Sequence, residues 1–309
     1  VVSRTEISHS HFKNNNATNG TVYIKGNNTK ITSGSNFADN NASYGGGIYI
    51  AGANTLISGS NFDRNNATYD GGGMYIKGDN TAIEAKSNFT ENHAINGGGI
   101  FLGGTNTEIS ASNFVRNNAT HDGAGMYVKG NNTKSIDGSN FTENHAAHDG
   151  AGMYIEGMNT LISNTYYERN NATDGAGLYI KGNNTNITSG SDFSGNNATY
   201  GAGAYLEGSN TLINGSTFDK NNATYGAGLY ISGNNTKVTS KSNFTENNAT
   251  VGGGMYIEGS NTAISGSNFK MNNAIDGAGM FISGNNTNIT SGTDFIENTA
   301  VNGAGMYLE

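Results

Sequence analysis

One unit of about 26 residues is repeated along nearly the whole chain and constrains the fold more than any other feature. The clearest marker of the repeat is an aromatic residue that returns every 25 to 27 positions. A short unit with a period between about 20 and 50 residues is typical of a solenoid, in which each copy buries its apolar face only against its neighbours. The aromatic markers are Phe12, Phe37, Phe62, Phe89, Phe114, Phe141, Tyr167, Phe193, Phe218, Phe244, Phe269 and Phe295.

Each unit contains three short stretches in which apolar and polar residues alternate, as residues 252–274 illustrate. Met255 and Ile257 flank a Tyr in the first stretch, and the third stretch ends at Phe269 before Asn272 closes the turn. Alternation with a period of two is typical of strands. We therefore predict an all-β fold, a single-stranded right-handed parallel β-helix with three short strands in each of about 12 coils.

Stacked coils place identical residues above one another at steps of about 4.8 Å. We expect the marker Phe residues to bury apolar area and the Asn residues to form an asparagine ladder that satisfies the buried corners. The aromatic residue between the two aliphatic positions is expected to point outward in a stacked column. This column comprises Tyr49, Tyr75, Phe101, Tyr127, Tyr154, Tyr179, Tyr205, Tyr230, Tyr256, Phe281 and Tyr307.

The repeat is unbroken from Phe12 to Tyr307, so we predict that residues 1–309 form one continuous β-helix domain. We interpret it as a segment of a longer array or as the protomer of a fibre. At Ser135 and Ile136 the apolar residue is displaced by one position, which we interpret as a local bulge.

Two tetrapeptides recur in nearly every unit and carry a resemblance to a known family. The first is Gly-Gly/Ala-Gly-aliphatic, as at residues 45–48 and 303–306, and the second is Phe-x-x-Asn, as at residues 62–65 and 295–298. They resemble the GGA(I/L/V) and FxxN repeats of polymorphic outer membrane proteins and related right-handed β-helix surface proteins. The resemblance implies a β-helix, and this chain departs from the family by lacking Cys.

The complete period spans two coils rather than one. The distance from the Gly after the first strand to the marker Phe alternates between 11 residues, as from Gly26, and 10 residues, as from Gly52. Charge alternates as well, since Asp39, Arg64 and Glu91 stand at one position of successive coils. Alternating signs would form ladders of opposite pairs and fix the register of the coils. Duplication of a two-coil ancestor explains the same pattern.

Several classes of function lack support in the composition. The net charge is −8 and the 16 Lys and Arg residues are scattered, so no basic groove for nucleic acid is expected. No apolar run is long enough to insert into a membrane. The absence of Cys excludes thiolate metal sites. A group of His121, Asp122, His145, His148 and Asp149 on adjacent coils is a possible metal site, but we interpret these as solvated loop residues and predict no catalytic, cofactor or metal site.

N-glycosylation sequons, Asn-x-Ser/Thr, are about twice as frequent as this composition gives by chance. One interpretation is heavy N-glycosylation, and another is that a few sequons were copied with the repeat. Asn-Asn-Thr sequons occur only on the coils with the longer corner, which spaces them by two coils or more. The predicted glycosylation sites are Asn16, Asn19, Asn27, Asn41, Asn66, Asn88, Asn118, Asn131, Asn140, Asn171, Asn183, Asn186, Asn197, Asn214, Asn222, Asn234, Asn243, Asn248, Asn285 and Asn288.

A column of Thr residues raises the alternative of ice binding. Its members share the inward phase of the neighbouring Ile residues, however, so we expect them to be buried. They are Thr29, Thr55, Thr81, Thr107, Thr133, Thr160, Thr185, Thr211, Thr236, Thr262 and Thr287.

These observations favour a structural, non-enzymatic protein: an extracellular or cell-surface β-helical rod or fibril core that displays N-linked glycans. We expect no cofactor apart from these covalent glycans. The expected partner is another copy of the chain, stacked head to tail into a filament. The alternatives are an adhesin-like or ice-binding β-helix surface protein and, with weaker support, a carbohydrate-active β-helix enzyme.

Overall fold

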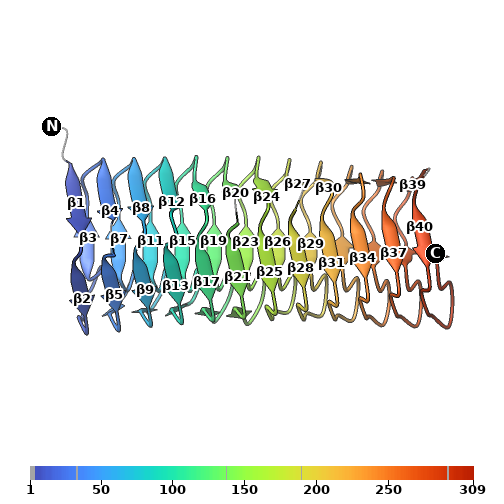
Figure 1. Cartoon of the computed structure of the whole chain (residues 1–309), viewed down its shortest axis with the longest axis horizontal. Helices are drawn as coiled ribbons and strands as arrows, with labels where there is room; N and C mark the ends of the chain where they lie inside the picture. The colour runs from blue at the N-terminus through green and yellow to red at the C-terminus, as the bar shows by residue number, and fades with distance from the viewer. Residues whose placement is uncertain (1–3, 33, 137, 189, 291) are drawn as a thin grey trace. The chain divides into compact units, whose positions relative to one another are not determined.

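The computed structural model describes residues 4–32, 34–136, 138–188, 190–290 and 292–309, which form strands, turns and bends and contain no helix. The chain divides into two compact units, residues 1–157 and 158–309. Inside each unit, every strand pairs in parallel with the equivalent strand of the next coil (Figure 1). This is the pattern that stacked coils of one repeat require.

Three sheets of six strands form the walls of unit 1. The first contains β1 (Thr5–Ser8), β4 (Thr29–Thr32), β8 (Thr55–Ser58), β12 (Thr81–Glu84), β16 (Glu108–Ser110) and β20 (Lys134–Ile136). The second contains β2 (His11–Lys13), β5 (Asn36–Ala38), β9 (Asn61–Asp63), β13 (Asn88–Thr90), β17 (Asn113–Val115) and β21 (Asn140–Thr142). The third contains β3 (Val22–Ile24), β7 (Ile48–Ile50), β11 (Met74–Ile76), β15 (Ile100–Leu102), β19 (Met126–Val128) and β23 (Met153–Ile155).

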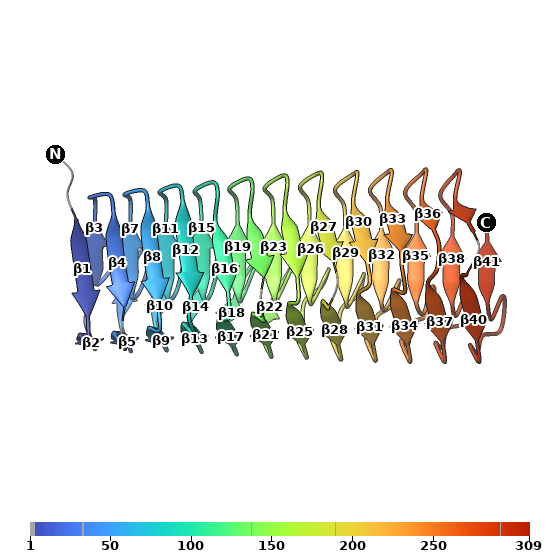
Figure 2. The same ribbon diagram turned by 45° about the horizontal axis from the view of Figure 1, so that its top comes forward.

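Unit 2 repeats the same three walls, again with six strands each (Figure 2). The first contains β24 (Leu161–Ser163), β27 (Asn186–Thr188), β30 (Leu212–Asn214), β33 (Lys237–Thr239), β36 (Ala263–Ile264) and β39 (Asn288–Ile289). The second contains β25 (Tyr166–Glu168), β28 (Asp192–Ser194), β31 (Thr217–Asp219), β34 (Asn243–Thr245), β37 (Asn268–Lys270) and β40 (Asp294–Ile296). The third contains β26 (Leu178–Ile180), β29 (Ala204–Leu206), β32 (Leu229–Ile231), β35 (Met255–Ile257), β38 (Met280–Ile282) and β41 (Met306–Leu308).

Unit 1 also has a fourth, very short strand per coil, which the sequence pattern did not predict. It contains only two residues and follows the Phe-x-x-Asn tetrapeptide, and in unit 2 the equivalent positions form isolated bridges such as Asn197 with Asn222. The short strands are β6 (Asn41–Ala42), β10 (Asn66–Ala67), β14 (His93–Ala94), β18 (Asn118–Ala119) and β22 (His145–Ala146).

The interior is built from columns of identical side chains, as predicted. Register pairs Ile with Ile and Phe with Phe, for example Ile57 with Ile83 and Phe62 with Phe89. The marker Phe rings stack with centroids 4.6 to 4.9 Å apart in unit 1. In unit 2 the spacing is 4.7 to 5.0 Å. Burial of these columns provides the main apolar stabilisation of each coil.

The corner between the first-wall and second-wall strands alternates in backbone conformation from coil to coil. In unit 2 the short corner has one residue with positive φ, Gly266 at 59°, whereas the long corner has two, Ser240 at 50° and Lys241 at 64°. Unit 1 shows the same alternation, with Ala85 at 53° and Lys86 at 61° in a long corner. The extra residue therefore adds a second left-handed position to the corner, which confirms the predicted two-coil period.

The predicted bulge at Ser135 and Ile136 is wrong. β20 pairs with β16 without interruption, and Ser135 stands opposite Ile109 at the inward position. Ser135 is fully buried there, whereas the side chain of Ile136 lies outside the described part of the structure. The coil tolerates a smaller inward side chain instead of shifting its register, because a shift would cost the hydrogen bonds of both neighbouring strands.

The Thr column is buried, as its phase predicted, and several of its hydroxyls lack a partner. Thr55, Thr81, Thr236 and Thr262 are at most 3% exposed, and their Oγ1 atoms make no hydrogen bond. A buried hydroxyl without a partner costs about 1–3 kcal/mol relative to one in water.

We therefore expect Thr262→Val to leave the fold unchanged and to stabilise it by about 1 kcal/mol, because Val keeps the shape and removes the unsatisfied hydroxyl. The midpoint of urea unfolding measures this, with the half-buried Thr245→Val as a control that should change little. A loss of stability in Thr262→Val alone would mean that the hydroxyl has a partner in solution.

Candidate functional site

The surface columns of polar side chains are the candidate functional site, and a buried Asn column supports them from inside. In unit 2, Asn221 Nδ2 donates to the backbone oxygen of Phe193 at 2.8 Å and to Asn247 Oδ1 at 3.0 Å. Its own Oδ1 accepts from the backbone N and from Nδ2 of Asn196, both at 3.0 Å. Asn65 of unit 1 repeats this arrangement. The predicted asparagine ladder is confirmed, and it holds the corner beneath the surface columns.

All twenty predicted sequon asparagines lie at exposed or half-buried positions, and none is in the interior. They fall into several surface columns that differ in their hydrogen bonds. Whether any of them carries a glycan stays a prediction, because side-chain exposure is necessary for an attached sugar and does not demonstrate one.

The Asn-Ala-Thr column consists of the sequon residues that follow the buried ladder, with Ser in place of Thr after Asn41. Its members are Asn16, Asn41, Asn66 and Asn118 in unit 1 and Asn171, Asn197, Asn222 and Asn248 in unit 2. Amide nitrogens along this column donate to the amide oxygen of the preceding coil. Asn222 Nδ2 donates to Asn197 Oδ1 at 2.9 Å, and Asn248 Nδ2 donates to Asn222 Oδ1 at 2.9 Å. His93 takes an Asn position in unit 1, where its Nδ1 lies 2.8 Å from Asn118 Nδ2.

The Asn-Asn-Thr column consists of Asn27 and Asn131 in unit 1 and Asn183, Asn234 and Asn285 in unit 2. In Asn27, Asn183 and Asn234 the side-chain oxygen makes the bond to the next coil. The Oδ1 atoms of Asn183 and Asn234 accept from the backbone N of Ser209 and of Ser260, both at 2.8 Å. The intervening coils carry a different residue, so neighbouring Asn members lie two coils apart, or four where Asp79 takes the long-corner position.

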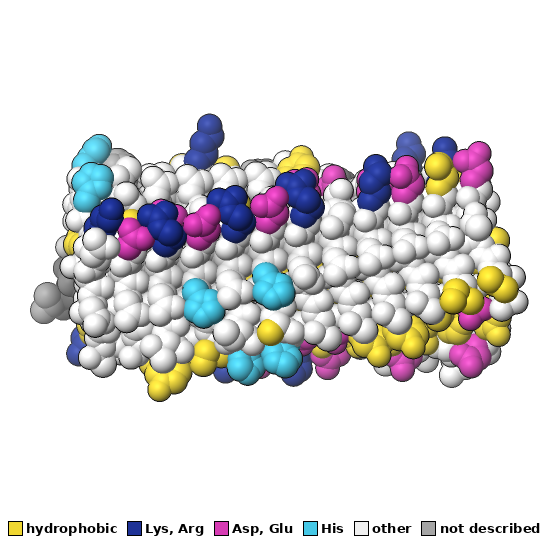
Figure 3. All heavy atoms as spheres, turned by 90° about the horizontal axis from the view of Figure 1, so that it is seen from below, with side chains coloured by type: hydrophobic (Ala, Val, Ile, Leu, Met, Phe, Trp, Pro, Cys, Tyr) yellow, Lys and Arg dark blue, Asp and Glu magenta, His cyan; other side chains and the backbone are white. Residues whose placement is uncertain are grey.

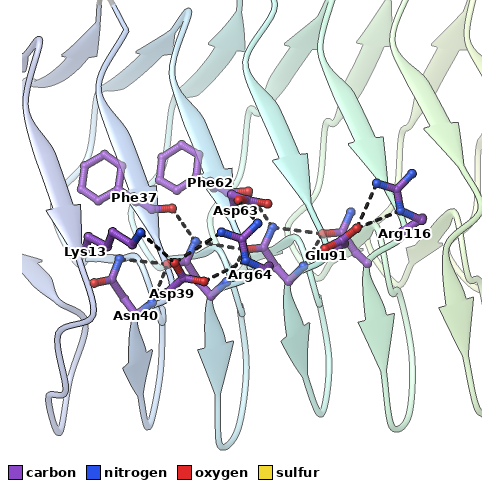
Figure 4. A network of polar contacts seen from close by, with 12 residues as sticks. Lys13, Phe37, Asp39, Asn40, Phe62, Asp63, Arg64, Glu91 and Arg116 are labelled. Atoms are coloured by element: carbon purple, nitrogen blue, oxygen red, sulfur yellow. Dashed lines mark hydrogen bonds and ion pairs between the residues drawn. The ribbon is translucent and has the colours of Figure 1, made fainter.

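The predicted charge ladder is present on the surface. In unit 1, Arg64 Nε bonds Asp39 Oδ1 at 2.8 Å, and Arg116 lies 2.9 Å from Glu91 (Figure 4). The guanidinium of Arg64 lowers the pKa of the Asp39 carboxyl. Figure 3 shows the alternating signs as a line of basic and acidic side chains on one face. Exposed pairs contribute little stability, so their main effect is on register.

These charged residues occupy left-handed backbone positions, which the sequence pattern did not show. Asp39, Arg64, Glu91 and Arg116 have φ between 49° and 55°. In unit 2 Gly195 stands at the equivalent position, with φ of 62°. Non-Gly side chains other than Asn and Asp disfavour this region. The chain therefore keeps alternating charge at a position where Gly or Asn would fit the backbone better.

The predicted outward aromatic column is stacked but more covered than expected. Tyr230 stacks between Tyr205 and Tyr256 with centroids 4.8 Å away on each side, and only 7% of its surface is exposed. Tyr200 covers its edge at 5.5 Å in a T-shaped contact. The ring faces are thus occupied by other rings, and a sugar ring cannot stack on them inside the column.

Glutamates on the following coil accept hydrogen bonds from this aromatic column. Tyr179 donates to Glu207 at 2.6 Å and Tyr230 donates to Glu258 at 2.7 Å. Burial, and the nearby Glu258, raise the pKa of Tyr230, and burial raises the pKa of Tyr75 to about 12.

Alkaline pH should therefore destabilise the protein. The neutral phenol is favoured in the folded chain, whereas an unfolded Tyr ionises near pH 10, so the folded state holds more protons than the unfolded state above that pH. Stability is complete below about pH 10 and falls as the pH rises further. The midpoint of urea unfolding should drop between about pH 10 and about pH 12, and an unchanged midpoint would contradict the protection of these phenols.

Four of the His and Asp residues considered as a possible metal site contact one another between adjacent coils. His121 and His148 lie with ring centroids 5.1 Å apart, and Asp122 Oδ1 accepts from the backbone N of Asp149 at 3.1 Å. Among the described residues no three His, Cys, Asp or Glu side chains converge in a way that could hold a metal ion. The same part of the chain offers no helix of the length and apolarity that crossing a membrane requires.

The stacked parallel strands and their side-chain ladders define this protein as a parallel β-helix. The family described as the right handed beta helix region matches residues 98–253, about half of the chain. The chain belongs to this family. Its fold is accordingly a right-handed β-solenoid of about 12 turns with three sheets, as predicted, whereas the narrower resemblance to polymorphic outer membrane proteins stays a prediction.

The comparison with solved structures gives a match of low sequence identity. The crystal structure of the Dettilon tailspike protein matches with a TM-score of 0.45 and 11% sequence identity, over 91% of this chain and 62% of the tailspike chain. This chain thus spans less than two thirds of the tailspike. No curated protein matches the sequence.

Proposed function

We propose that the protein is a structural, non-enzymatic β-helical glycoprotein of the cell surface or extracellular space. Its coils support columns of N-linked glycans, and copies of the chain associate head to tail. The observation that carries the proposal is the distribution of Asn. One Asn of each coil between Asn40 and Asn272 is buried and holds the corner, whereas the sequon asparagines are confined to the surface.

The charged side chains support a structural role. Carboxylates of the ladder are engaged by cations of neighbouring coils, such as Asp39 by Lys13 and Arg64, or Glu246 by Lys220. A glycosidase needs two acidic groups that face a common substrate space and have separated pKa values. Regular pairing of acids with bases along the ladder favours register over acid–base catalysis.

The Thr column does not favour ice binding. Ice-binding hydroxyls must face water, whereas Thr262 is 1% exposed and Thr236 is fully buried. An adhesin-like role is compatible with the same surface columns and would use the glycans or the amides as its contacts.

Intact mass before and after enzymatic release of N-glycans tests the proposal on protein from its natural source. We expect the mass to exceed the 32.1 kDa of the bare chain by several glycans and to return to near that value after release. A single mass near that of the bare chain in both samples would overturn the glycoprotein proposal.

Light scattering over a wide range of protein concentration tests association. Open strand edges at the ends of a solenoid pair readily with a second copy, so we expect the average mass to rise with concentration. A monomer mass that does not depend on concentration would overturn head-to-tail assembly and leave the glycan question untouched.

A further inference from the structure

We infer that the Asn-Asn-Thr column carries the N-linked glycans of the folded protein, and that the Asn-Ala-Thr column does not carry them on adjacent coils. This inference rests on the proposed function, because it names the modification sites of a protein proposed to be glycosylated. It follows from a difference in hydrogen bonding: the side-chain amide bonds the neighbouring coil through its oxygen in one column and through its nitrogen in the other.

Three members of the Asn-Asn-Thr column, Asn27, Asn183 and Asn234, are anchored through oxygen alone in the described part of the chain. Asn183 and Asn234 each accept a backbone N–H of the following coil on Oδ1 at 2.8 Å, and Asn27 accepts the N–H of Ala53 at 2.9 Å. The Nδ2 atoms of these three residues make no hydrogen bond within the described part of the chain, and all three side chains are exposed. Each amide is therefore held by one end while the other end faces solvent.

An Asp in the same column shows that the fold does not need the amide nitrogen. Asp79 stands at the equivalent position of a long-corner coil, and its Oδ1 accepts from the backbone N of Thr105 at 2.7 Å and from the Thr105 hydroxyl at 3.1 Å. Asp has no Nδ2, yet it makes the same bond to the next coil. The nitrogen of the Asn residues is surplus to the structure at this position.

That surplus nitrogen is the atom that N-glycosylation uses. Nδ2 attacks the anomeric carbon of a sugar activated as a pyrophosphate ester, so an Nδ2–carbon bond forms while the carbon–oxygen bond to pyrophosphate breaks. The pyrophosphate leaves with the electron pair, and Nδ2 gives up one proton. No hydrogen bond of the fold is lost, because Oδ1 keeps its partner.

The two columns also differ in the distance between successive Asn residues. Asn183 and Asn234 lie two coils apart, about 9.6 Å, and the coil between them presents the small Ser209. In the Asn-Ala-Thr column, Asn197, Asn222 and Asn248 follow on adjacent coils about 4.8 Å apart, and their nitrogens already donate along the column. Sugars on neighbouring members would collide, whereas every member of the Asn-Asn-Thr column can carry one.

The sequon Thr residues indicate when the sugar is attached. Thr185 and Thr236, which complete the sequons of Asn183 and Asn234, are fully buried in the folded coil. An enzyme that recognises the sequon through its Thr cannot reach them there. Attachment to this column therefore precedes closure of the coil.

Site-resolved mass spectrometry of protein from its natural source tests the inference. Glycan release in heavy-oxygen water converts each glycosylated Asn to a labelled Asp. We expect label at Asn27, Asn183 and Asn234, and no chain with label at both Asn197 and Asn222. Label elsewhere with Asn183 and Asn234 unlabelled, or label on adjacent coils of one chain, would overturn the inference while the glycoprotein proposal stands. Absence of all label would overturn both.

Asp substitutions give a matched structural test that does not depend on occupancy. In chains made without glycosylation, Asn183→Asp and Asn234→Asp should leave the unfolding midpoint unchanged, because each keeps the acceptor that Asp79 provides naturally. In a glycosylating secretory host, this double variant should lose the mass of two glycans relative to the parent. The double variant Asn197→Asp and Asn222→Asp, whose sites lie on adjacent coils, should lose at most one. Destabilisation of the unglycosylated variants would show that Nδ2 makes a stabilising hydrogen bond in the folded chain, and would overturn the inference.

Discussion

Replacing one buried ladder residue, Asn221→Ala, should destabilise the protein by about 3–4 kcal/mol. The substitution removes the four side-chain hydrogen bonds that Asn221 makes with Phe193, Asn196 and Asn247. It leaves the buried backbone N–H of Asn196 without an acceptor and opens a small cavity. Because Asn221 is fully buried, water cannot replace these partners without entering the interior.

The adjacent residue gives the control. Asn222→Ala removes an identical side chain from an exposed ladder, where water replaces the bonds to Asn197 and Asn248, and should cost about 0.5 kcal/mol or less. Urea unfolding followed by far-ultraviolet circular dichroism compares the two. Similar losses in both variants would mean that the buried ladder adds no more than the surface one, and would contradict the account of the core given above.

Adding one methyl group to the third glycine of the triplet, Gly254→Ala, should cost about 3 kcal/mol or more. A Cβ built there would lie 2.6 Å from the backbone oxygen of Gly279 and 2.9 Å from Cδ1 of Phe269. Neither neighbour can move away, since the oxygen belongs to the next coil and the ring is held in the Phe stack. We expect a lower unfolding midpoint or loss of the folded chain from the soluble fraction.

The preceding glycine provides the matched variant. Gly253→Ala adds the same methyl one residue earlier, at the position where the neighbouring coils of unit 2 carry Ala227 and Ala278, both fully buried. A Cβ built at Gly253 would lie 2.5 Å from the backbone oxygen of Ala278. The neighbouring coils that carry Ala show that the backbone adjusts to a Cβ at this place, so the expected loss is below about 1 kcal/mol. A larger loss in Gly253→Ala than in Gly254→Ala would contradict the assignment of close packing to the third glycine.

Much of the fold could be predicted because the same pattern of inward and outward residues recurs in every coil. Inward positions such as Ile57, Phe62 and Thr81 share one phase of the alternation, and register then places each beside its counterpart. The displacement of the apolar residue from position 135 to Ile136 predicts a bulge, and that prediction is wrong. Local spacing alone does not include the hydrogen bonds of the two neighbouring strands, which hold the register against a one-residue shift.

Less of the candidate site could be predicted. Sequons are visible in the sequence, and the two-coil spacing of Asn183 and Asn234 follows from counting. Which end of each amide is engaged does not, because Asn183 bonds through Oδ1 to Ser209 and Asn222 bonds through Nδ2 to Asn197. That difference depends on the direction of each Asn side chain at the corner. The periodicity of the sequence shows which Asn residues are exposed but not where their side chains point.

The sequence by itself determined the β-helix, its coil length, the two-coil alternation and the identity of the stacked columns, because periodicity fixes which residues share a face. Only the tertiary structure decided which columns are buried and hydrogen-bonded in the interior and which face solvent at the surface. It placed charged residues at left-handed positions, covered the aromatic column at its edges and left the Nδ2 of Asn183 and Asn234 without a structural partner. The physical reason is that hydrogen-bond direction and burial depend on the neighbouring coil, which no single repeat contains.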